Sequence, residues 1–386
     1  MTQDPLARVT ALLSPQGRAL LDELAAATSQ SALQVGTRLR ERYPADLVAS
    51  AMAQHELRLA ARAKFTRAER MYLTRPGLEQ ASSEVVARHR AARYAGVAAV
   101  ADLCCGIGGD LVALAGTGAH VVGIDLDPVH LLMAGVNAEA YGVGERVSTV
   151  QADVRDADLA GVSAVFVDPA RRDARGGRAV DGEPPLGWCV RLTERVAAVG
   201  VKAAPALPHD RVPADWELEF VAVGRDLKEA VLWSPALATG RRCATILPEA
   251  WSLQPEPGPP VEVAEPGPYL LDPNPAVTRA GLVEDLARRV GAWKIDERIA
   301  FLATGHEVHT PFARTLRVLD SSPWNEKALR SRLRDLDVGA VDVRRRGLAG
   351  DVDVLRRRLK LTGTRRATLV MTRFRDRPWA LLCVDP

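Results

Sequence analysis

Three aspartates end three consecutive apolar stretches of the chain, so their positions could serve one polar ligand. Asp102 lies near the end of "AAVADLC", Asp125 ends "HVVGID" and Asp153 ends "VSTVQAD". These stretches predict β-strands, and the helices predicted between them would make the strands parallel. Because the carboxyl ends of parallel strands meet at one edge of a sheet, we expect the three carboxylates to face a common crevice.

A glycine-rich turn follows the first of these strands, within "ADLCCGIGGDLVAL". Gly106, Gly108 and Gly109 allow a sharp turn and a close approach of ligand to backbone, and the helix that follows offers free N–H groups. The dinucleotide pattern G-x-G-x-x-G fails here because Leu111 occupies its third glycine position. Asp110 would also repel a pyrophosphate, so a nicotinamide dinucleotide is disfavoured.

S-adenosylmethionine matches these groups better, because it carries an ammonium, a ribose diol and an adenine but no phosphate. Asp102 is predicted to bind the ammonium, Asp125 the ribose hydroxyls and Asp153 the adenine amino group. The glycine-rich backbone would lie along the methionine part. The alternative is that such strand-end acids only cap helices, which is the role we predict for Asp127.

The fourth predicted strand ends in "VFVDPARR", which places Asp168 and Pro169 where substrate would meet the cofactor. A carboxylate and a proline carbonyl can accept hydrogen bonds from an amine and direct its lone pair toward a methyl donor. We therefore predict Asp168 and Pro169 as catalytic residues in the methylation of an exocyclic amine.

Basic residues follow Pro169 at the position where an aromatic side chain would stack on a base. Arg171 and Arg172 are predicted substrate contacts, because a guanidinium can stack on a base and bind phosphate. Pairing with nearby acids is the alternative. The segment "RRDARGGRAVDGEPP" is glycine-rich and basic, and we predict a loop that can close over a substrate.

Hydrophobic periodicity divides the chain into four parts. Residues 1–96 are predicted to be helical, residues 97–253 alternate strands with helices, residues 254–268 are a linker rich in proline and glycine, and residues 269–386 mix helices with a final hairpin. The alternation predicts an α/β fold with a Rossmann-like, doubly wound sheet. The last part predicts a separate α+β domain.

The remaining composition excludes several classes of protein. The five cysteines form no C-x-x-C pair and the seven histidines do not cluster with them, so we expect neither a metal site nor a disulfide framework. The first residues do not resemble a signal peptide, and no stretch approaches the ~20 apolar residues of a membrane helix. A cytoplasmic protein without membrane contact is the simplest prediction.

The C-terminal end of the chain is basic. Residues 340–386 hold twelve lysines and arginines against five aspartates and glutamates. Arg345, and Arg357 on a helix whose leucines would face inward, are predicted substrate contacts. Aromatic residues are sparse here, so recognition of folded RNA by shape and backbone is favoured over single-strand reading. A solvated basic face is the alternative.

The motif D-x-G-x-G-x-G appears as Asp102, Cys104, Gly106 and Gly108, with cysteine in the first glycine position. The chain thereby resembles the class I methyltransferases, with a catalytic half like that of trimethylguanosine synthases. From about Lys64 onward it resembles bacterial members with a C-terminal THUMP-like domain, through "GLEQASSEVVARHRAARY", "DPARR", "YLLDPNPAVTRAGL" and "VDVRRRGLAGDVDVLRRRLKLTG".

That resemblance implies further contacts and a partner. Gln80 and Ser82 precede the first strand, in a segment that folds over the cofactor in the family, and Cys104 would line the cofactor site. THUMP domains occur in RNA-modifying enzymes, so RNA is the implied partner.

We predict an S-adenosylmethionine-dependent methyltransferase that acts on an amine nitrogen of a base in structured RNA. One alternative is a methyltransferase for a small molecule or a protein, and another is a catalytically silent protein that binds S-adenosylmethionine and RNA. The sequence does not indicate an oligomeric state.

Overall fold

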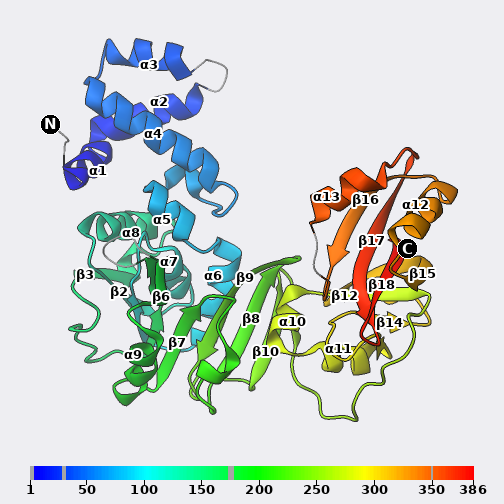
Figure 1. The fold of residues 1–386 in the computed structure, drawn as a ribbon. Coiled ribbons are helices and arrows are strands. Elements are labelled where there is room, and N and C mark those ends of the chain that lie inside the picture. The colour runs from blue at the N-terminus through cyan, green and yellow to red at the C-terminus, as the bar shows by residue number, and fades with distance from the viewer. Residues whose placement is uncertain (1–3, 28–31, 173–177, 349–350) are drawn as a thin grey trace. The chain divides into compact units, whose positions relative to one another are not determined.

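The computed structural model describes residues 4–27, 32–172, 178–348 and 351–386. The chain forms two compact units, one made of Met1–Glu217 with Ala230–Thr239, the other of Leu218–Glu229 with Gly240–Pro386. Figure 1 shows the elements of both units.

Helices make up the N-terminal part of the first unit, as predicted. They begin with α1 (Pro5–Leu13), α2 (Pro15–Ala26), α3 (Ala32–Arg40) and α4 (Ala45–Ala61). Asp4 and Ser14 cap the first two helices, and each is followed by a proline that fits the first helical turn. The leucines of α2 lie in a buried cluster that also includes Ile107 and Met133, so these helices share a core with the sheet domain that follows. Four short helices then lead to the sheet: η1 (Ala68–Arg70), α5 (Arg75–Gln80), α6 (Glu84–Ala91) and η2 (Ala92–Tyr94).

A nine-stranded sheet follows, in the order β11-β10-β8-β9-β7-β4-β1-β2-β3. Its strands are β1 (Ala99–Leu103), β2 (His120–Asp125), β3 (Val147–Gln151), β4 (Ala164–Val167), β7 (Ala198–Ala203), β8 (Glu217–Val223), β9 (Asp226–Trp233), β10 (Arg242–Leu247) and β11 (Trp251–Leu253). The pairs β1–β2, β2–β3, β1–β4 and β4–β7 are parallel. The strand order reverses between β1 and β4, which is where α/β sheets of this kind bind ligands.

Helices connect the parallel strands. They are α7 (Gly109–Gly116), α8 (Pro128–Ala140), η3 (Gly144–Arg146), α9 (Leu186–Arg191), η4 (Leu192–Glu194) and, before β8, η5 (His209–Arg211). Asp127 caps α8 by accepting a hydrogen bond from Val129 N at 2.8 Å, which confirms its predicted capping role.

The sheet is mixed rather than wholly parallel. β9 pairs antiparallel with β7, and β11 pairs antiparallel with β10. Only Gly224 and Arg225 join β8 to β9, and a parallel crossover requires a much longer connection. Gly224 has φ +55°, as such a tight turn demands.

The segment after Pro169, expected to be a loop, contains a small two-stranded sheet. Its strands are β5 (Ala170–Arg172) and β6 (Arg178–Glu183), paired antiparallel. Residues 173–177 between them lie outside the described part of the chain.

The second unit contains a seven-stranded sheet in the order β13-β14-β12-β15-β18-β17-β16. Its strands are β12 (Tyr269–Pro273), β13 (Trp293–Lys294), β14 (Leu302–Thr304), β15 (Ala313–Pro323), β16 (Val338–Arg345), β17 (Arg365–Phe374) and β18 (Arg377–Val384). Only the β16–β17 pair is parallel among the described pairings of this sheet. Residues 254–268 hold no helix and belong to the second unit, where Val263 forms a β-bridge with Lys294.

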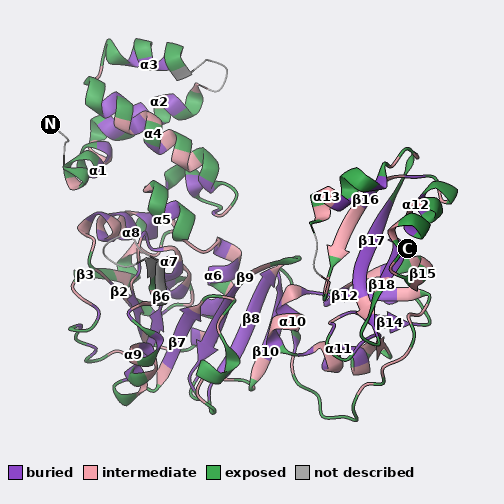
Figure 2. Cartoon of the chain, viewed as in Figure 1, coloured by how far each residue is buried: buried purple, intermediate pink, exposed green. Residues whose placement is uncertain are grey.

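Alternate residues of β17 enter two different cores, so this sheet is buried on both faces. Leu369 and Met371 lie in one hydrophobic cluster, whereas Val370 lies in another. Leu355 and Leu359 of α13 (Val352–Leu359) belong to the first, and the arginines between them are exposed, as predicted. Figure 2 shows this separation of buried and exposed residues.

The other helices of this unit are α10 (Pro275–Ala280), α11 (Val283–Val290) and α12 (Glu326–Asp335). Residues 275–290 form two helices because Gly281 ends α10 with φ +70°. No helix in the described ranges combines the length and apolar character needed to cross a bilayer.

Candidate cofactor and acceptor site

Asp102 is a buried carboxylate without a hydrogen-bond partner. It lies on β1 between Ala101 and Leu103, and it is 1% exposed. Neither Oδ1 nor Oδ2 has a hydrogen-bond partner in the described structure. Burial, reinforced by the negative charges of Asp110 and Asp168, raises the pKa of Asp102 well above its ordinary value. A buried carboxylate that lacks hydrogen-bond donors favours a cationic ligand. An ammonium would supply both a positive charge and the N–H donors.

The neighbouring acid Asp110 is already neutralised. Arg90 of α6 is 1% exposed and donates to Asp110 Oδ1 through Nε at 3.0 Å, and its Nη2 makes a second contact with the same oxygen. The Arg90 guanidinium lies 5.2 Å from the centre of the Phe166 ring. Asp110, at the start of α7, therefore forms a buried ion pair that joins α7 to α6. Of these two aspartates, only Asp102 has no partner for its carboxylate in the described structure.

The turn between β1 and α7 uses left-handed backbone at alternate residues. Cys104, Gly106 and Gly108 have φ of +63°, +52° and +84°. The cysteine thus occupies a conformation that favours glycine, which explains why the related motif carries glycine there. At Gly108 a Cβ would approach Ala134 Cα to 2.9 Å, so only glycine lets the turn approach α8 this closely. Around Gly106 a Cβ would meet nothing within 4 Å, so this backbone faces open space.

Asp125 holds the turn in place. Its Oδ2 accepts a hydrogen bond from Gly106 N at 2.8 Å, and its Oδ1 accepts one from Asp127 N at 3.0 Å. The amides of Cys104 and Cys105 donate to Ile124 O, which ties the turn to the end of β2. Each carboxylate oxygen of Asp125 can accept a further hydrogen bond, so the side chain can still receive ribose hydroxyls.

Three of the predicted acids gather around Cys104. Burial raises the pKa of the Cys104 thiol, and the charges of Asp125, Asp168 and Asp102 raise it further. Cys105 is buried against Gly123 and its pKa is also raised. Neither thiol is suited to nucleophilic chemistry, because the thiolate is disfavoured at both positions.

Asp153 follows a residue that is hydrogen-bonded to Asp125, since Ala152 N donates to Asp125 O at 3.2 Å. It follows β3, and its carboxylate accepts a hydrogen bond from Arg155 N at 2.9 Å and pairs with the Arg155 side chain at 3.3 Å. Arg155 also pairs with Glu183 at the end of β6. The structure therefore gives Asp153 an ion-pair partner that the sequence did not indicate, and its contact with adenine stays a prediction.

The segment before β1 is anchored by Lys64. Its ammonium donates to the carbonyls of Leu78, Glu79 and Ala81, at 2.7, 3.2 and 2.9 Å. Ser82 Oγ is buried and has no partner in the described structure, so it is the second orphaned polar group among the predicted cofactor contacts. Gln80 is exposed at the end of α5.

Lys202 is a site residue that the sequence analysis missed. It lies on β7, is 8% exposed, and its ammonium binds Asp168 Oδ2 at 2.6 Å. Asp168 N in turn donates to Leu103 O at 3.2 Å, which fixes the end of β4 beside the end of β1. The available signal was a single lysine within the apolar run "AVGVKA".

The structure describes only some of the residues that we predicted to contact the substrate. Pro169 lies close to Gly182 of β6, where a Cβ would approach the Pro169 Cβ to 3.0 Å. The side chains of Arg171 and Arg172 lie outside the described residues. Arg345 and Arg357 are exposed on β16 and α13 of the second unit.

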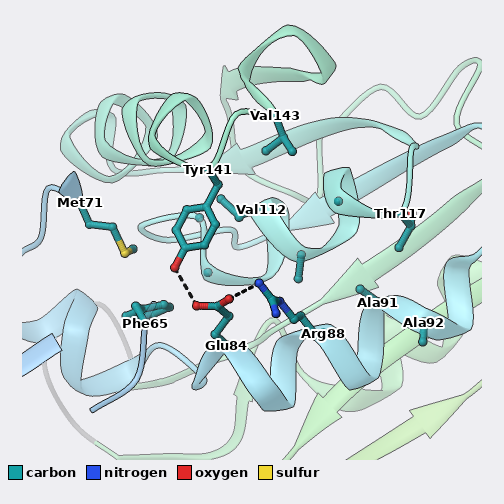
Figure 3. Close-up of a pocket in the computed structure, with 14 residues that line it drawn as sticks. Phe65, Met71, Glu84, Arg88, Ala91, Ala92, Val112, Thr117, Tyr141 and Val143 are labelled. Carbon is teal, nitrogen blue, oxygen red and sulfur yellow. Dashed lines mark hydrogen bonds and ion pairs between the residues drawn. The ribbon is translucent and has the colours of Figure 1, made fainter. Parts of the chain in front are cut away.

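A cavity of about 390 Å³ lies beside the turn but is not the predicted cofactor site. Its walls include Phe65, Met71 and Val112, and Gly108 alone of the described cofactor candidates lines it. In Figure 3 the Tyr141 hydroxyl donates to Glu84, at 2.9 Å, and Glu84 also pairs with Arg88. These contacts join α6 to the end of α8.

S-adenosylmethionine fits the residues at the strand ends. The orphaned carboxylate of Asp102 suits its ammonium, the open backbone at Gly106 suits its methionine part, and Asp125 retains acceptors for its ribose. No three His, Cys, Asp or Glu side chains of the described residues gather as a metal site requires. Sheet and site together define a class I methyltransferase.

Comparison with known proteins identifies the family. Two Mycobacterium tuberculosis proteins, from strains CDC 1551 and H37Rv, are named as uncharacterised S-adenosylmethionine-dependent methyltransferases. Each is 38% identical over 312 residues, which cover 78% of this chain and 84% of the relative. An uncharacterised RNA methyltransferase of Parasynechococcus marenigrum is 37% identical over 91 residues, 22% of this chain and 20% of that protein. The chain belongs to the S-adenosylmethionine-dependent methyltransferases.

Three family models match parts of the chain, and one solved structure shares its fold. The RNA cap guanine-N2 methyltransferase model matches residues 97–196, the THUMP domain-like model matches residues 313–384, and a domain of unknown function matches residues 4–61. The fold resembles that of a Porphyromonas gingivalis W83 crystal structure with a TM-score of 0.75 and 20% identity, over 95% of this chain and 96% of that one.

Cys104→Gly is expected to leave cofactor affinity and thermal stability nearly unchanged. Glycine removes the strain of the left-handed backbone, which stabilises the fold by about 1 kcal/mol. Glycine also makes the unfolded chain more flexible, which destabilises the fold by about 1 kcal/mol. Cys104→Val is expected to destabilise, because a β-branched residue is disfavoured at this φ. Thermal unfolding and titration with S-adenosylmethionine measure both. A similar loss in the two variants would instead assign the thiol a role of its own.

Proposed function

We propose that this methyltransferase transfers a methyl group to an amine nitrogen of a base in structured RNA. The match of residues 97–196 to the RNA cap guanine-N2 methyltransferase model supports a base amine, and guanine N2 is the acceptor it favours. The THUMP domain-like match and the basic C-terminal segment support RNA as the substrate. The Parasynechococcus relative, named as an RNA methyltransferase, points the same way over its short match.

The observation that carries the proposal is the ion pair at the ends of β4 and β7. Lys202 contacts Oδ2 of Asp168 at 2.6 Å, and an ammonium on this oxygen does not use the acceptor capacity of Oδ1. Asp168 is only partly exposed, so an acceptor that reaches it meets a carboxylate already held in one orientation. Oδ1 can then accept a hydrogen bond from an amine N–H.

The residues of the chain act by binding and orientation. S-adenosylmethionine supplies an electrophilic methyl group on its sulfonium. Asp102 would hold the ammonium and Asp125 the ribose, while Asp168 and the Pro169 carbonyl would accept hydrogen bonds from the two N–H groups of the acceptor amine. Its lone pair is thereby directed at the methyl carbon, and positioning of this kind provides much of the acceleration.

Labelled methyl transfer to total RNA from a strain that lacks this gene tests the proposal. The wild-type protein should label this RNA, and Asp168→Ala should reduce labelling by about 100-fold or more, because the amine is no longer oriented. Asp158→Ala is the matched control, since Asp158 is an exposed aspartate of the same unit whose contact is with the nearby Ala160 N. Labelling that is equal in wild type and Asp168→Ala would contradict the acceptor geometry, and labelling of protein alone would contradict RNA as substrate.

A further inference from the structure

A concave pocket of about 600 Å³ lies within the second compact unit, and arginines dominate its walls. Arg225 comes from the turn between β8 and β9, and the successive residues Arg344, Arg345 and Arg346 come from the end of β16. Asp272 at the end of β12 forms part of the floor. The segments that meet here are distant in the sequence, so the arginines are gathered by the fold and not by a local run alone.

Asp272 organises two of these arginines. It is 4% exposed, and its Oδ2 accepts from Arg225 Nη2 at 2.8 Å while its Oδ1 accepts from Arg346 Nη2 at 2.9 Å. The single negative charge of Asp272 thus balances only one of the two positive charges that it contacts. Each guanidinium has five N–H donors, so several remain available to a ligand.

Further contacts hold both guanidinium groups in place. Arg346 Nη1 donates to Thr278 Oγ1 at 3.3 Å, and its guanidinium lies 5.1 Å from the centre of the Phe301 ring. Arg225 Nη1 donates to Asp272 O at 3.1 Å. Donors that are fixed before binding lose little entropy when a ligand arrives.

The pocket retains an excess of positive charge. Arg344 has only a distant partner in Asp342, at 3.5 Å, and its Nε is buried without a partner in the described structure. Asp226, the other acid of the lining, is already paired with Lys228. Burial lowers the pKa of Arg225, Asp272 opposes that shift, and Arg344 and Arg346 add to it. The arginines therefore repel one another, and an anion would relieve the repulsion.

Phosphate is the anion that this arrangement suits best. Guanidinium groups bind phosphate oxygens in bidentate pairs, and several of them around a concave site can surround a tetrahedral group. We propose that the pocket formed by Arg225, Arg344, Arg345 and Arg346 binds a phosphate group of the RNA substrate. This inference rests on the proposed function for the identity of the substrate. The group is either an internal phosphodiester or a terminal phosphate, and both present the same oxygens.

The variant Arg344→Gln/Arg345→Gln in the full-length protein tests the pocket. Arg225 and Arg346 are left intact, because removing either would leave Asp272 buried and short of a partner. The probe is an RNA hairpin labelled at its 3′ end, with a 5′-phosphate or a 5′-hydroxyl. We expect binding to weaken about tenfold, as for the loss of charge-assisted hydrogen bonds, and the dependence of log Kd on log salt to become shallower.

Arg365→Gln/Arg366→Gln is the matched control. Both residues are exposed at the start of β17, and the pairing of Val338 with Arg365 and of Arg345 with Met371 places them at the opposite end of the β16–β17 pair. The two double variants lose the same charge, one from β16 and the other from the paired strand β17. A loss confined to Arg344→Gln/Arg345→Gln supports a pocket, whereas equal losses, or none in the pocket variant, would overturn it.

The two forms of the hairpin distinguish the phosphate sources. A preference for the 5′-phosphate that the pocket variant abolishes assigns a terminal phosphate, and equal binding of both forms with the pocket-specific loss assigns internal phosphodiesters. Titration with S-adenosylmethionine should be unaffected in both variants, which also confirms that they are folded. RNA binding that depends on the pocket without methyl transfer to RNA would contradict the proposed function while supporting the pocket.

Discussion

Asp102→Asn is expected to weaken binding of S-adenosylmethionine strongly and, at neutral pH, to make the cofactor-free protein more stable. Asp102 is buried and neither of its oxygens has a hydrogen-bond partner in the described structure. Its ionised form therefore lowers the stability of the folded protein when no cofactor is bound. Asparagine removes the charge, and we expect a gain of about 1–3 kcal/mol in the free energy of unfolding. Binding should weaken about 100-fold or more, because the cofactor ammonium loses its buried counter-charge.

The pH dependence of this effect has a definite sign. Burial raises the pKa of Asp102 in the folded protein, whereas the unfolded chain keeps the ordinary value near 4. As the pH rises above that value the unfolded chain ionises and gains stability, while the folded protein must keep a proton or bury a charge. The advantage of Asp102→Asn should therefore be greatest above neutral pH and shrink as the pH falls toward ~4. Thermal unfolding without cofactor from pH 4 to 8 measures it.

Asp110→Asn is the control for Asp102→Asn. Asp110 is the counter-charge of the buried Arg90, so the same chemical change should destabilise the protein there. Opposite signs at two neighbouring buried aspartates would establish that Asp102 lacks a partner. A loss of stability in both variants, with cofactor affinity retained by Asp102→Asn, would contradict the assignment of Asp102 to the ammonium.

Lys202→Met is expected to reduce methyl transfer by about 100-fold and to leave the affinity for S-adenosylmethionine unchanged. Lys202 contacts Asp168 and is a positioning residue, since its ammonium orients the carboxylate that we assign to the acceptor amine. Methionine is of similar length and apolar, so it can occupy the buried space. The Asp168 side chain is 27% exposed, so the loss of its partner does not strand a buried charge.

A double-mutant cycle separates this role from a structural one. If Lys202 acts through Asp168, adding Lys202→Met to Asp168→Ala should cause little further loss of transfer rate. Lys327→Met, an exposed lysine on α12, is the control for loss of a positive charge. Additive losses, or a loss of cofactor affinity in Lys202→Met, would contradict the positioning role.

The strands that carry the candidate acids could be predicted because their signal is local. β1, β2 and β4 are short apolar runs between turn residues, whereas β3 is an exposed strand at the edge of the sheet; the observed bounds of all four lie within two residues of the predicted ones. Parallel strands buried on both faces favour such continuous apolar runs. An acid at the end of each run then identifies one edge of the sheet. Asp102 and Asp125, together with Asp168 of the fourth strand, all raise the pKa of Cys104, whereas the common crevice predicted for Asp102, Asp125 and Asp153 stays a prediction.

The contacts that could not be predicted join elements far apart in the sequence. Lys202 reaches Asp168 only because β7 is the neighbour of β4, across 34 residues. Arg90 could not be assigned to Asp110 from spacing, since that pair depends on how α6 packs on α7. The antiparallel direction of β9 follows from a two-residue connection, which the apolar pattern of its strand does not reveal.

The two hydrogen bonds that Asp125 accepts have a consequence for the kinetics of cofactor binding. Its two oxygens accept hydrogen bonds from Gly106 N and Asp127 N, so groups of the chain itself fix the orientation of this carboxylate and of the turn. Association should then proceed in a single diffusive step, with no slow ordering phase after encounter.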